Sequence, residues 1–217
     1  MGISHPLQIK IMYVQYGCGL SAPSGWRNFD ASPTLILQRV PGVGELVKRK
    51  FVRFPKNVEY GNVMKRLPLP DMSCEGVYCS HVLEHLALTD LRRALRETLR
   101  VLKPGGVFRL VVPDLEVMAR AYVADQSDSA AITFVRSTLL GKEERSRSAL
   151  GIIRDWLGNS AHLWMWDYRG LAAELRTVGF SDIRRAQFGD SFDPKFSEAE
   201  DESRWRDSLG IESRRPL

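Results

Sequence analysis

The sequence has few cysteines and no long apolar run, and each absence removes a class of protein. Its only cysteines are Cys18, Cys74 and Cys79, and no two of them are spaced as CxxC. This scattered, odd-numbered set favours buried free thiols in a reducing compartment over a disulfide framework or a zinc ribbon. No window approaches the roughly 18 apolar residues of a membrane helix, and the first residues lack the pattern of a secretory signal. We therefore expect a cytoplasmic protein without a membrane span.

Strong charge of one sign is also missing. The net charge is +5, and the basic stretches at 48–53, 92–100 and 184–185 are interleaved with apolar residues. This spacing is typical of solvated helix and strand faces and argues against nucleic acid as a partner, although an anionic substrate remains open. The run VVPDLE at 111–116 has one proline and no aromatic residue. It therefore lacks the Asn/Asp-Pro-Pro-aromatic tetrapeptide with which enzymes that modify nucleic acids hold a flipped base.

Strand-like and helix-like segments alternate along the chain, which predicts an α/β fold built on a mainly parallel sheet. We expect residues 1–217 to form a single domain. Thr89 is the expected N-cap of the clearest helix, and KPGG at 103–106 is expected to end it. The expected strands are 7–16, 26–30, 58–63, 76–80, 107–114, 181–189 and 208–215, and the expected helices are 89–102, much of 115–160, and 168–180.

Small or polar residues follow the expected strands. In open α/β sheets, ligands bind beyond the carboxyl ends of the strands, so these residues outline a candidate cleft. Glycines at the first strand end let the backbone approach a ligand, and an acid after the second strand can accept hydrogen bonds from a ribose diol. The residues concerned are Gly17 and Gly19, Asp30, Asn62, Ser80 with His81, and Asp114.

Five segments together carry a family resemblance: YGCG (16–19), GWRNFDASP (25–33), YGNVMKRLPLPD (60–71), YCSHVLEHL (78–86) and LRETLRVLKPGGVFRLVVPDLE (95–116). In this order and spacing, the chain resembles a class I S-adenosylmethionine-dependent methyltransferase with a shortened first βα unit. The resemblance implies a Rossmann-like fold: a mainly parallel seven-stranded sheet with an antiparallel last strand and helices on both faces. It also implies S-adenosyl-L-methionine as cofactor, S-adenosyl-L-homocysteine as product, and a helical insertion on the substrate side at 115–165.

The same resemblance assigns expected roles near the first two strands. The turn of Gly17, Cys18 and Gly19 would hold the methionine moiety of the cofactor, and Asp30 would bind the ribose hydroxyls. Gln15 and Ser21 occupy places where the family usually has an acid and a third glycine. Only 11 positions separate Gly19 from Asp30, so the first helix is expected to be absent or one turn long.

Further along, the resemblance implies that Asn62 and Val63 border the adenine and that Ser80 and His81 line the cleft beside the cofactor. Methyl transfer is an in-line displacement, in which alignment provides much of the acceleration. An alcohol acceptor would also need a general base. His81 is the first candidate for this base, followed by His162 and Asp114. The alternatives are that His81 only hydrogen-bonds the cofactor or the backbone, and that His162 packs with neighbouring tryptophans.

His81 to His85 also fit H-x-x-E-H, a pattern of zinc peptidases. That site requires both histidines on one long helix and a further ligand downstream. Here His81 ends a strand and only about one turn follows, so we expect no metal site. Glu84 is expected to face solvent or cap a neighbouring helix, while Leu83 and Leu86 pack inward.

The sequence thus predicts a methyltransferase that acts on a small-molecule, sugar or surface-glycan acceptor. A degenerate methyltransferase fold that binds without catalysis is the alternative, and a zinc hydrolase and a nucleic-acid methyltransferase are less favoured. Trp164, Trp166 and Tyr168 either stack on an acceptor ring or pack in the core. The sequence does not indicate an oligomeric state.

Overall fold

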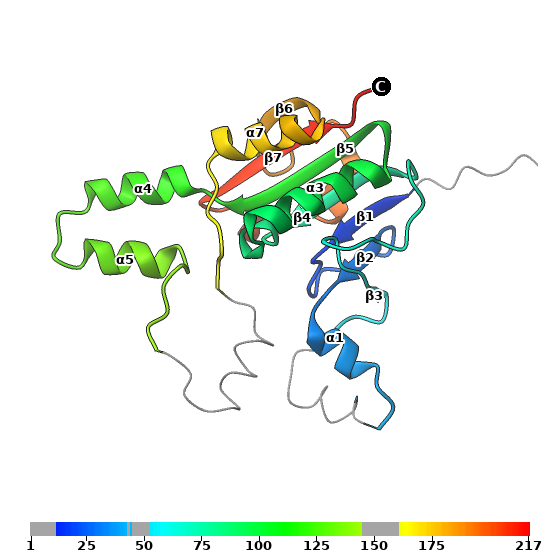
Figure 1. The fold of residues 1–217 in the computed structure, drawn as a ribbon, viewed down its shortest axis with the longest axis horizontal. Helices are drawn as coiled ribbons and strands as arrows, with labels where there is room; N and C mark the ends of the chain where they lie inside the picture. The colour runs from blue at the N-terminus through cyan, green and yellow to red at the C-terminus, as the bar shows by residue number, and fades with distance from the viewer. Residues whose placement is uncertain (1–11, 43, 45–52, 145–160) are drawn as a thin grey trace, which may run out of the picture.

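The computed structural model describes residues 12–42, 44, 53–144 and 161–217. A seven-stranded sheet with the order β3-β2-β1-β4-β5-β7-β6 forms its centre (Figure 1). Strand β7 is antiparallel to both of its neighbours, and the other strand pairs are parallel. The predicted Rossmann-like sheet is therefore confirmed. Its strands are β1 (Tyr13–Tyr16), β2 (Arg27–Asp30), β3 (Val58–Tyr60), β4 (Cys74–Ser80), β5 (Leu102–Pro113), β6 (Ser181–Ala186) and β7 (Ser208–Arg214).

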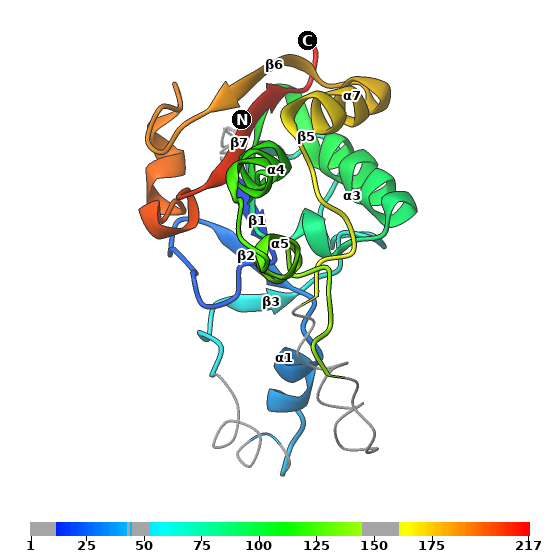
Figure 2. The same ribbon diagram turned by 90° about the vertical axis from the view of Figure 1, so that its left-hand side faces the viewer.

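Helices α3 and α7 lie on one face of the sheet, and α4 and α5 extend beyond its edge (Figure 1 and Figure 2). Figure 2 shows α3 and α7 together on one side of the strands, and Figure 1 shows α4 and α5 projecting beyond the end of β5. Across the described part of the chain, no helix has the length and apolarity needed to cross a membrane. The α-helices are α1 (Pro33–Gln38), α3 (Leu88–Val101), α4 (Leu115–Ala124), α5 (Ala130–Ser137) and α7 (Tyr168–Val178), and the 3₁₀ helices are η1 (Leu83–His85), η2 (Pro194–Glu198) and η3 (Glu202–Arg204).

The predicted N-cap of α3 is wrong, and the helix ends just before KPGG as predicted, but the next strand starts earlier than expected. Helix α3 begins at Leu88 with Ala87 as its N-cap, and no side chain caps it, so Thr89 lies inside the first turn. KPGG does not separate α3 from the next strand, because β5 starts at Leu102 directly after the helix. Leu102 pairs with Cys74 before a register shift in the β4–β5 ladder, so the KPGG segment is the irregular start of the strand. Residues 7–11 and 145–160, included in an expected strand and an expected helical region, lie outside the described residues.

The alternation of side chains along the strands divides the core into two layers. Val77, Phe108 and Leu110 face α3 and α7 in the larger layer. Tyr78 and Val111, one position away from these residues, face the opposite side, where they pack with Phe196 and Trp205. No helix lies between Gly19 and Asp30, as predicted. The first βα unit therefore has no helix to cover this face of the sheet. Phe196 from η2 and Trp205, the residue after η3, cover it instead.

Arg109 is a fully buried cation in the middle of β5, at 0% exposure. Its guanidinium pairs with the carboxylates of Glu200, Glu212 and Asp190, and it stacks 4.7 Å from the ring centroid of Trp205. Burial of a charge is tolerated when it is paired and hydrogen-bonded. The sequence reasoning did not single out this residue. Its contacts tie the central strand to the C-terminal segment that covers the second face.

We predict that Arg109→Ala destabilises the protein strongly, because it leaves the buried carboxylate of Glu200 without its cation. Loss of one partner of a buried pair typically costs about 3–5 kcal/mol. Arg92→Ala is the control, since Arg92 pairs with Glu174 at the surface and such pairs contribute up to about 1 kcal/mol. Urea unfolding gives both free energies of unfolding. An equal loss in the two variants would show that the Arg109 network is not essential to the fold.

Candidate functional site

A cavity of about 480 Å³ lies at the carboxyl ends of β1, β2, β3 and β4. This is the edge of the sheet at which the sequence predicts a ligand. Its volume falls within the range of about 300–1,000 Å³ that is usual for small-molecule pockets. The lining residues are Tyr16, Gly17, Asp30, Ala31, Ser32, Pro33, Gly61, Asn62, Val63, Met64, His81, Val82, His85 and Leu86.

Gly17 fixes the wall of the cavity after β1. Its φ of +62° lies in the left-handed region, and a Cβ at this position would come within 2.2 Å of Cγ2 of Val82. A side chain is therefore excluded both by backbone strain and by the side chain of Val82. Gly19 has φ +54° with open space around it, so its requirement is conformational alone. Gly17 lines the cavity, whereas Gly19 does not.

Asp30 organises the loops at the end of β2. One carboxylate oxygen accepts the N–H of Gly19 at 3.0 Å, and the other accepts the N–H of Ser32 at 2.7 Å. Each oxygen keeps a second lone pair, and Asp30 lines the cavity. The sequence reasoning identified this residue but not its bond to the glycine turn.

Gln15 and Ser21, the two departures from the family pattern, are bonded to each other. Nε2 of Gln15 donates to the carbonyl oxygen of Ser21 and, at 2.7 Å, to Oδ1 of Asn28. The buried amide thus supports the loop that follows the glycine turn. Cys18 is also buried, and burial raises the pKa of its thiol to about 12. Neither Gln15 nor Cys18 belongs to the cavity lining.

Asn62 and Val63 line the cavity at the end of β3, as the sequence predicts. Oδ1 of Asn62 accepts the N–H of Met64 at 2.9 Å, so the side chain holds its own loop. Gly61, just before it, lies against the ring of Phe29, and a Cβ there would come within 2.6 Å of that ring. The close packing of this loop on β2 shapes the adjoining wall.

His81 adopts a backbone conformation that is rare for a residue with a side chain. Its φ is +53° at the end of β4, and such strain is most often found at functional sites. Nε2 of His81 is 2.9 Å from the carbonyl oxygen of Arg204, and the guanidinium of Arg204 donates to the hydroxyl and carbonyl oxygens of Ser80. His81 lines the cavity, whereas Ser80 is buried beneath Arg204. The sequence reasoning missed Arg204, because nothing in its local pattern connects it with β4.

The prediction for Glu84 is wrong: its carboxylate does not face solvent or cap a helix. The residue is 1% exposed, with Oε1 3.2 Å from Nδ1 of His81 and 4.0 Å from Nε2 of His85. Glu84 lies in the 3₁₀ turn η1, and the segment of Leu163 and Trp164 is hydrogen-bonded to its carbonyl oxygen. Leu83 and Leu86 pack into the core, as predicted.

His162 lies beside this turn, far from it in sequence. Its N–H donates to the carbonyl oxygen of Leu139, and the N–H groups of Leu163 and Trp164 donate to the carbonyl oxygen of Glu84. The rings of His162 and His85 meet edge to face, with centroids 5.0 Å apart. Burial lowers the pKa of His162, which favours the neutral imidazole. His162 packs against His85 and does not line the cavity.

Asp114, the third candidate base, has other partners. It is the N-cap of α4, where it accepts the N–H of Glu116 at 2.9 Å, and its second oxygen lies 3.3 Å from a guanidinium nitrogen of Arg185. The structure does not bring Asp114 to the cavity lining.

The aromatic residues after His162 divide between core and surface. Trp166 is 5% exposed and belongs to the main core, and the partly buried Tyr168 packs against it. Trp164 is 42% exposed, with its ring centroid 6.0 Å from that of Trp166. Of the two tryptophans, Trp164 therefore presents the larger surface to a ligand.

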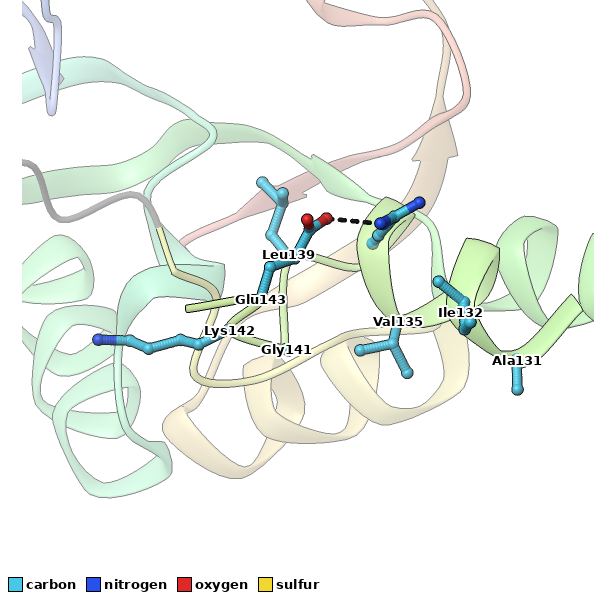
Figure 3. A pocket seen from close by; sticks show the side chains of 8 residues that line it. Ala131, Ile132, Val135, Leu139, Gly141, Lys142 and Glu143 are labelled. Atoms are coloured by element: carbon cyan, nitrogen blue, oxygen red, sulfur yellow. Dashed lines mark hydrogen bonds and ion pairs between the residues drawn. The ribbon is translucent and has the colours of Figure 1, made fainter. Parts of the chain in front are cut away.

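A larger hollow, about 600 Å³, lies on α5 and the loop after it (Figure 3). Ile132, Val135 and Leu139 contribute apolar surface, and Arg136 pairs with Glu143 at 2.6 Å. The strand ends contribute no residue to its lining. The convergent polar groups lie in the 480 Å³ cavity, so we take that cavity as the candidate site.

Comparisons with known proteins find similarity to methyltransferases. Residues 15–110 match the family model of the methyltransferase domain. A probable S-adenosylmethionine-dependent methyltransferase of Mycolicibacterium smegmatis is 41% identical over 63 residues, which are 29% of this chain and 23% of that protein. A probable methyltransferase of Aspergillus luteorubrus is 42% identical over 50 residues, 23% of this chain and 18% of that one. The chain thus spans less than a quarter of either relative.

Among solved structures, the CurJ carbon methyltransferase aligns with 95% of this chain and 49% of its own, with a TM-score of 0.50 and 11% identity. This likeness concerns the fold alone. The matched residues run from β1 into β5 and include every residue that lines the cavity. The sheet order, the glycine turn and the family match agree: over residues 15–110 the chain is similar to the methyltransferase domain, and its sheet is that of a class I fold, a family whose cofactor is S-adenosyl-L-methionine.

Proposed function

We propose that the cavity at the ends of β1 to β4 binds S-adenosylmethionine and that the protein transfers its methyl group to a small-molecule or saccharide acceptor. The observation that carries this proposal is the lining itself, in which Gly17, Asp30 and Asn62 come from three successive strand ends. Bound S-adenosylmethionine supplies an electrophilic methyl group on a sulfonium.

The residues present fit such a group. Gly17 borders the cavity with its backbone alone, because Val82 already occupies the place that a Cβ would take. Asp30 is held in place by two backbone N–H groups and retains lone pairs for a ribose diol. The bond from Gln15 to the Ser21 carbonyl holds the loop after the glycine turn. These features support a binding-competent site over a degenerate one.

The acceptor class is proposed from Trp164. Its exposed indole lies on the segment that is hydrogen-bonded to η1, and an exposed aromatic face suits stacking on a sugar or aromatic ring. We also propose that the projecting helices α4 and α5 form the acceptor side of a single domain. Whether His81, His162 or Asp114 removes the acceptor proton stays a prediction. The two nitrogens of His81 already lie near the Arg204 carbonyl and the Glu84 carboxylate.

The first prediction for this function concerns Asp30. Asp30→Asn should weaken S-adenosylhomocysteine binding tenfold or more, because the amide loses the charge and places a donor against a backbone N–H. Calorimetry measures the affinity, and Asp128→Asn, at an exposed carboxylate between α4 and α5, is the matched control.

An analogue of S-adenosylhomocysteine without the ribose 2′-hydroxyl separates ribose binding from loop support. If Asp30 binds the ribose, Asp30→Asn should lower the affinity for the analogue less than it lowers the affinity for S-adenosylhomocysteine. Measuring both ligands with both proteins gives a thermodynamic cycle that isolates this difference. Equal weakening of both ligands would refute the ribose contact. Wild-type protein that binds no S-adenosylhomocysteine at millimolar concentration would refute the proposed function.

The second prediction concerns Gly17. Gly17→Ala should lower S-adenosylhomocysteine affinity at least tenfold, since the new Cβ displaces Val82 in the cavity wall. Gly189→Ala is the control: it has φ +72° and nothing within 4 Å, so it carries only the backbone strain of about 1–2 kcal/mol. Adding Val82→Ala to Gly17→Ala should restore part of the affinity. A Gly17→Ala variant that binds like wild type would show that this wall does not contact the cofactor.

A further inference from the structure

Four polar side chains from three segments converge beside the candidate cavity. His81 ends β4, Glu84 and His85 belong to η1, and His162 precedes α7. Ligand atoms of Glu84, His85 and His162 all lie within 4.8 Å of one another. The cofactor proposal uses none of these three side chains in binding, so their convergence needs its own explanation.

The carboxylate of Glu84 is the central group of this cluster. Neither of its oxygens has a hydrogen-bond partner among the described residues, although Oε1 is 3.2 Å from Nδ1 of His81. No Lys or Arg forms an ion pair with Glu84 in the described part of the chain; its close neighbours are histidines. A buried carboxylate is stable only when it is paired, protonated or bound to a metal. A bound cation would supply the partner that this carboxylate lacks.

The histidines present lone pairs to this carboxylate. Nδ1 of His85 is 3.0 Å from the carbonyl oxygen of Ala161. A carbonyl only accepts, so the proton is on Nδ1 and the lone pair is on Nε2, which faces Glu84. This outer hydrogen bond is the arrangement that orients metal-bound histidines. Nδ1 of His162 is buried and has no partner among the described residues.

We propose that Glu84, His85 and His162 bind one divalent cation of the Zn²⁺ or Mn²⁺ type. Two imidazoles and a carboxylate are a common donor set for such ions, and open coordination positions remain. Metal–ligand bonds of about 2.1 Å place the ligand atoms about 3–4 Å apart. Rotation of the three side chains would bring their ligand atoms, now within 4.8 Å of one another, to this distance. His162 supplies the downstream ligand that the H-x-x-E-H pattern by itself lacks, and Glu84 is a ligand here and not a base.

The position of the site suggests its use, and this step rests on the proposed function. His85 lines the cofactor cavity, so the cation would lie at the cavity wall. A cation there would bind an acceptor hydroxyl and lower its pKa. The hydroxyl proton passes to solvent, the new O–CH₃ bond forms as the S–CH₃ bond breaks, and the sulfonium becomes a neutral thioether. The acceptor would then be an oxygen nucleophile.

Metal binding is tested on the full chain after EDTA treatment and dialysis, without cofactor. Titration with Co²⁺, followed by visible absorption, should show one ion per chain with N/O ligation and no thiolate charge-transfer band, and Zn²⁺ should displace it. Zn²⁺ should also raise the melting temperature of the wild type. Absence of stoichiometric binding of Co²⁺, Zn²⁺ and Mn²⁺ would overturn the proposal, and so would a thiolate band.

Variants assign the ligands. Glu84→Gln and His162→Gln should each weaken Zn²⁺ affinity a hundredfold or more, whereas His5→Gln and Asp128→Asn should leave it unchanged. Glu84→Gln should also raise the melting temperature of the metal-free protein, because it removes the buried charge, and this readout does not need the metal. Zn²⁺ binding that survives both ligand substitutions, or that is lost in His5→Gln, would overturn the assignment. S-adenosylhomocysteine calorimetry in EDTA tests the cofactor site separately.

Discussion

The buried ion pairs of Arg109 connect the parts of this structure on which the candidate site depends. A guanidinium in the middle of β5 holds Glu200 and Asp190 against the sheet. The same C-terminal segment carries Arg204, which hydrogen-bonds Ser80 and accepts from His81 through its carbonyl oxygen. The Arg204 carbonyl fixes the orientation of the His81 ring at the cavity. That orientation thus depends on the charge network of Arg109, which lies on the other face of the sheet.

The cavity itself depends on short-range steric and hydrogen-bonding constraints. Gly17 and Val82 are in contact across two strand ends, and Asp30 fixes the glycine turn through the N–H of Gly19. Gln15 reaches the carbonyl of Ser21 where the family pattern has other residues. A site can therefore depart from its family at two positions and still keep a defined wall, provided that the replacements bond to each other.

Much of the fold and of the cavity could be predicted from the sequence. Apolar alternation and turn residues locate the strands, and the rule that ligands bind at strand ends identifies Gly17, Asp30, Asn62 and His81, all of which line the cavity. These signals are local. Thr89 was misplaced as a cap because helix boundaries depend on the backbone as well as on residue type, and here Ala87 occupies the N-cap without a side-chain bond.

Contacts between distant segments could not be predicted in this way. The sequence shows Glu84 as one acid among apolar residues, and only a 3₁₀ turn followed by the packing of residues 162–164 buries it. The proximity of His162 to His85 has no sequence signal, because the chain between them passes through β5, α4 and α5. In the sequence, Arg109 looks like an arginine on a half-exposed strand. Its burial depends on β7 and the C-terminal segment, which pack against it.

Phe196 and Trp205 cover the second face of the sheet, so this face can become buried only after both residues have been synthesised. Both side chains are synthesised after every strand except β7, yet they pack on Tyr78 and Val111 in β4 and β5. A nascent chain that has already made the whole cavity lining therefore still exposes one apolar face. Such long-range closure is slow and leaves surfaces open to aggregation. The segment that carries Phe196 and Trp205 therefore closes an apolar face of the sheet that the residues of the cavity lining cannot close themselves.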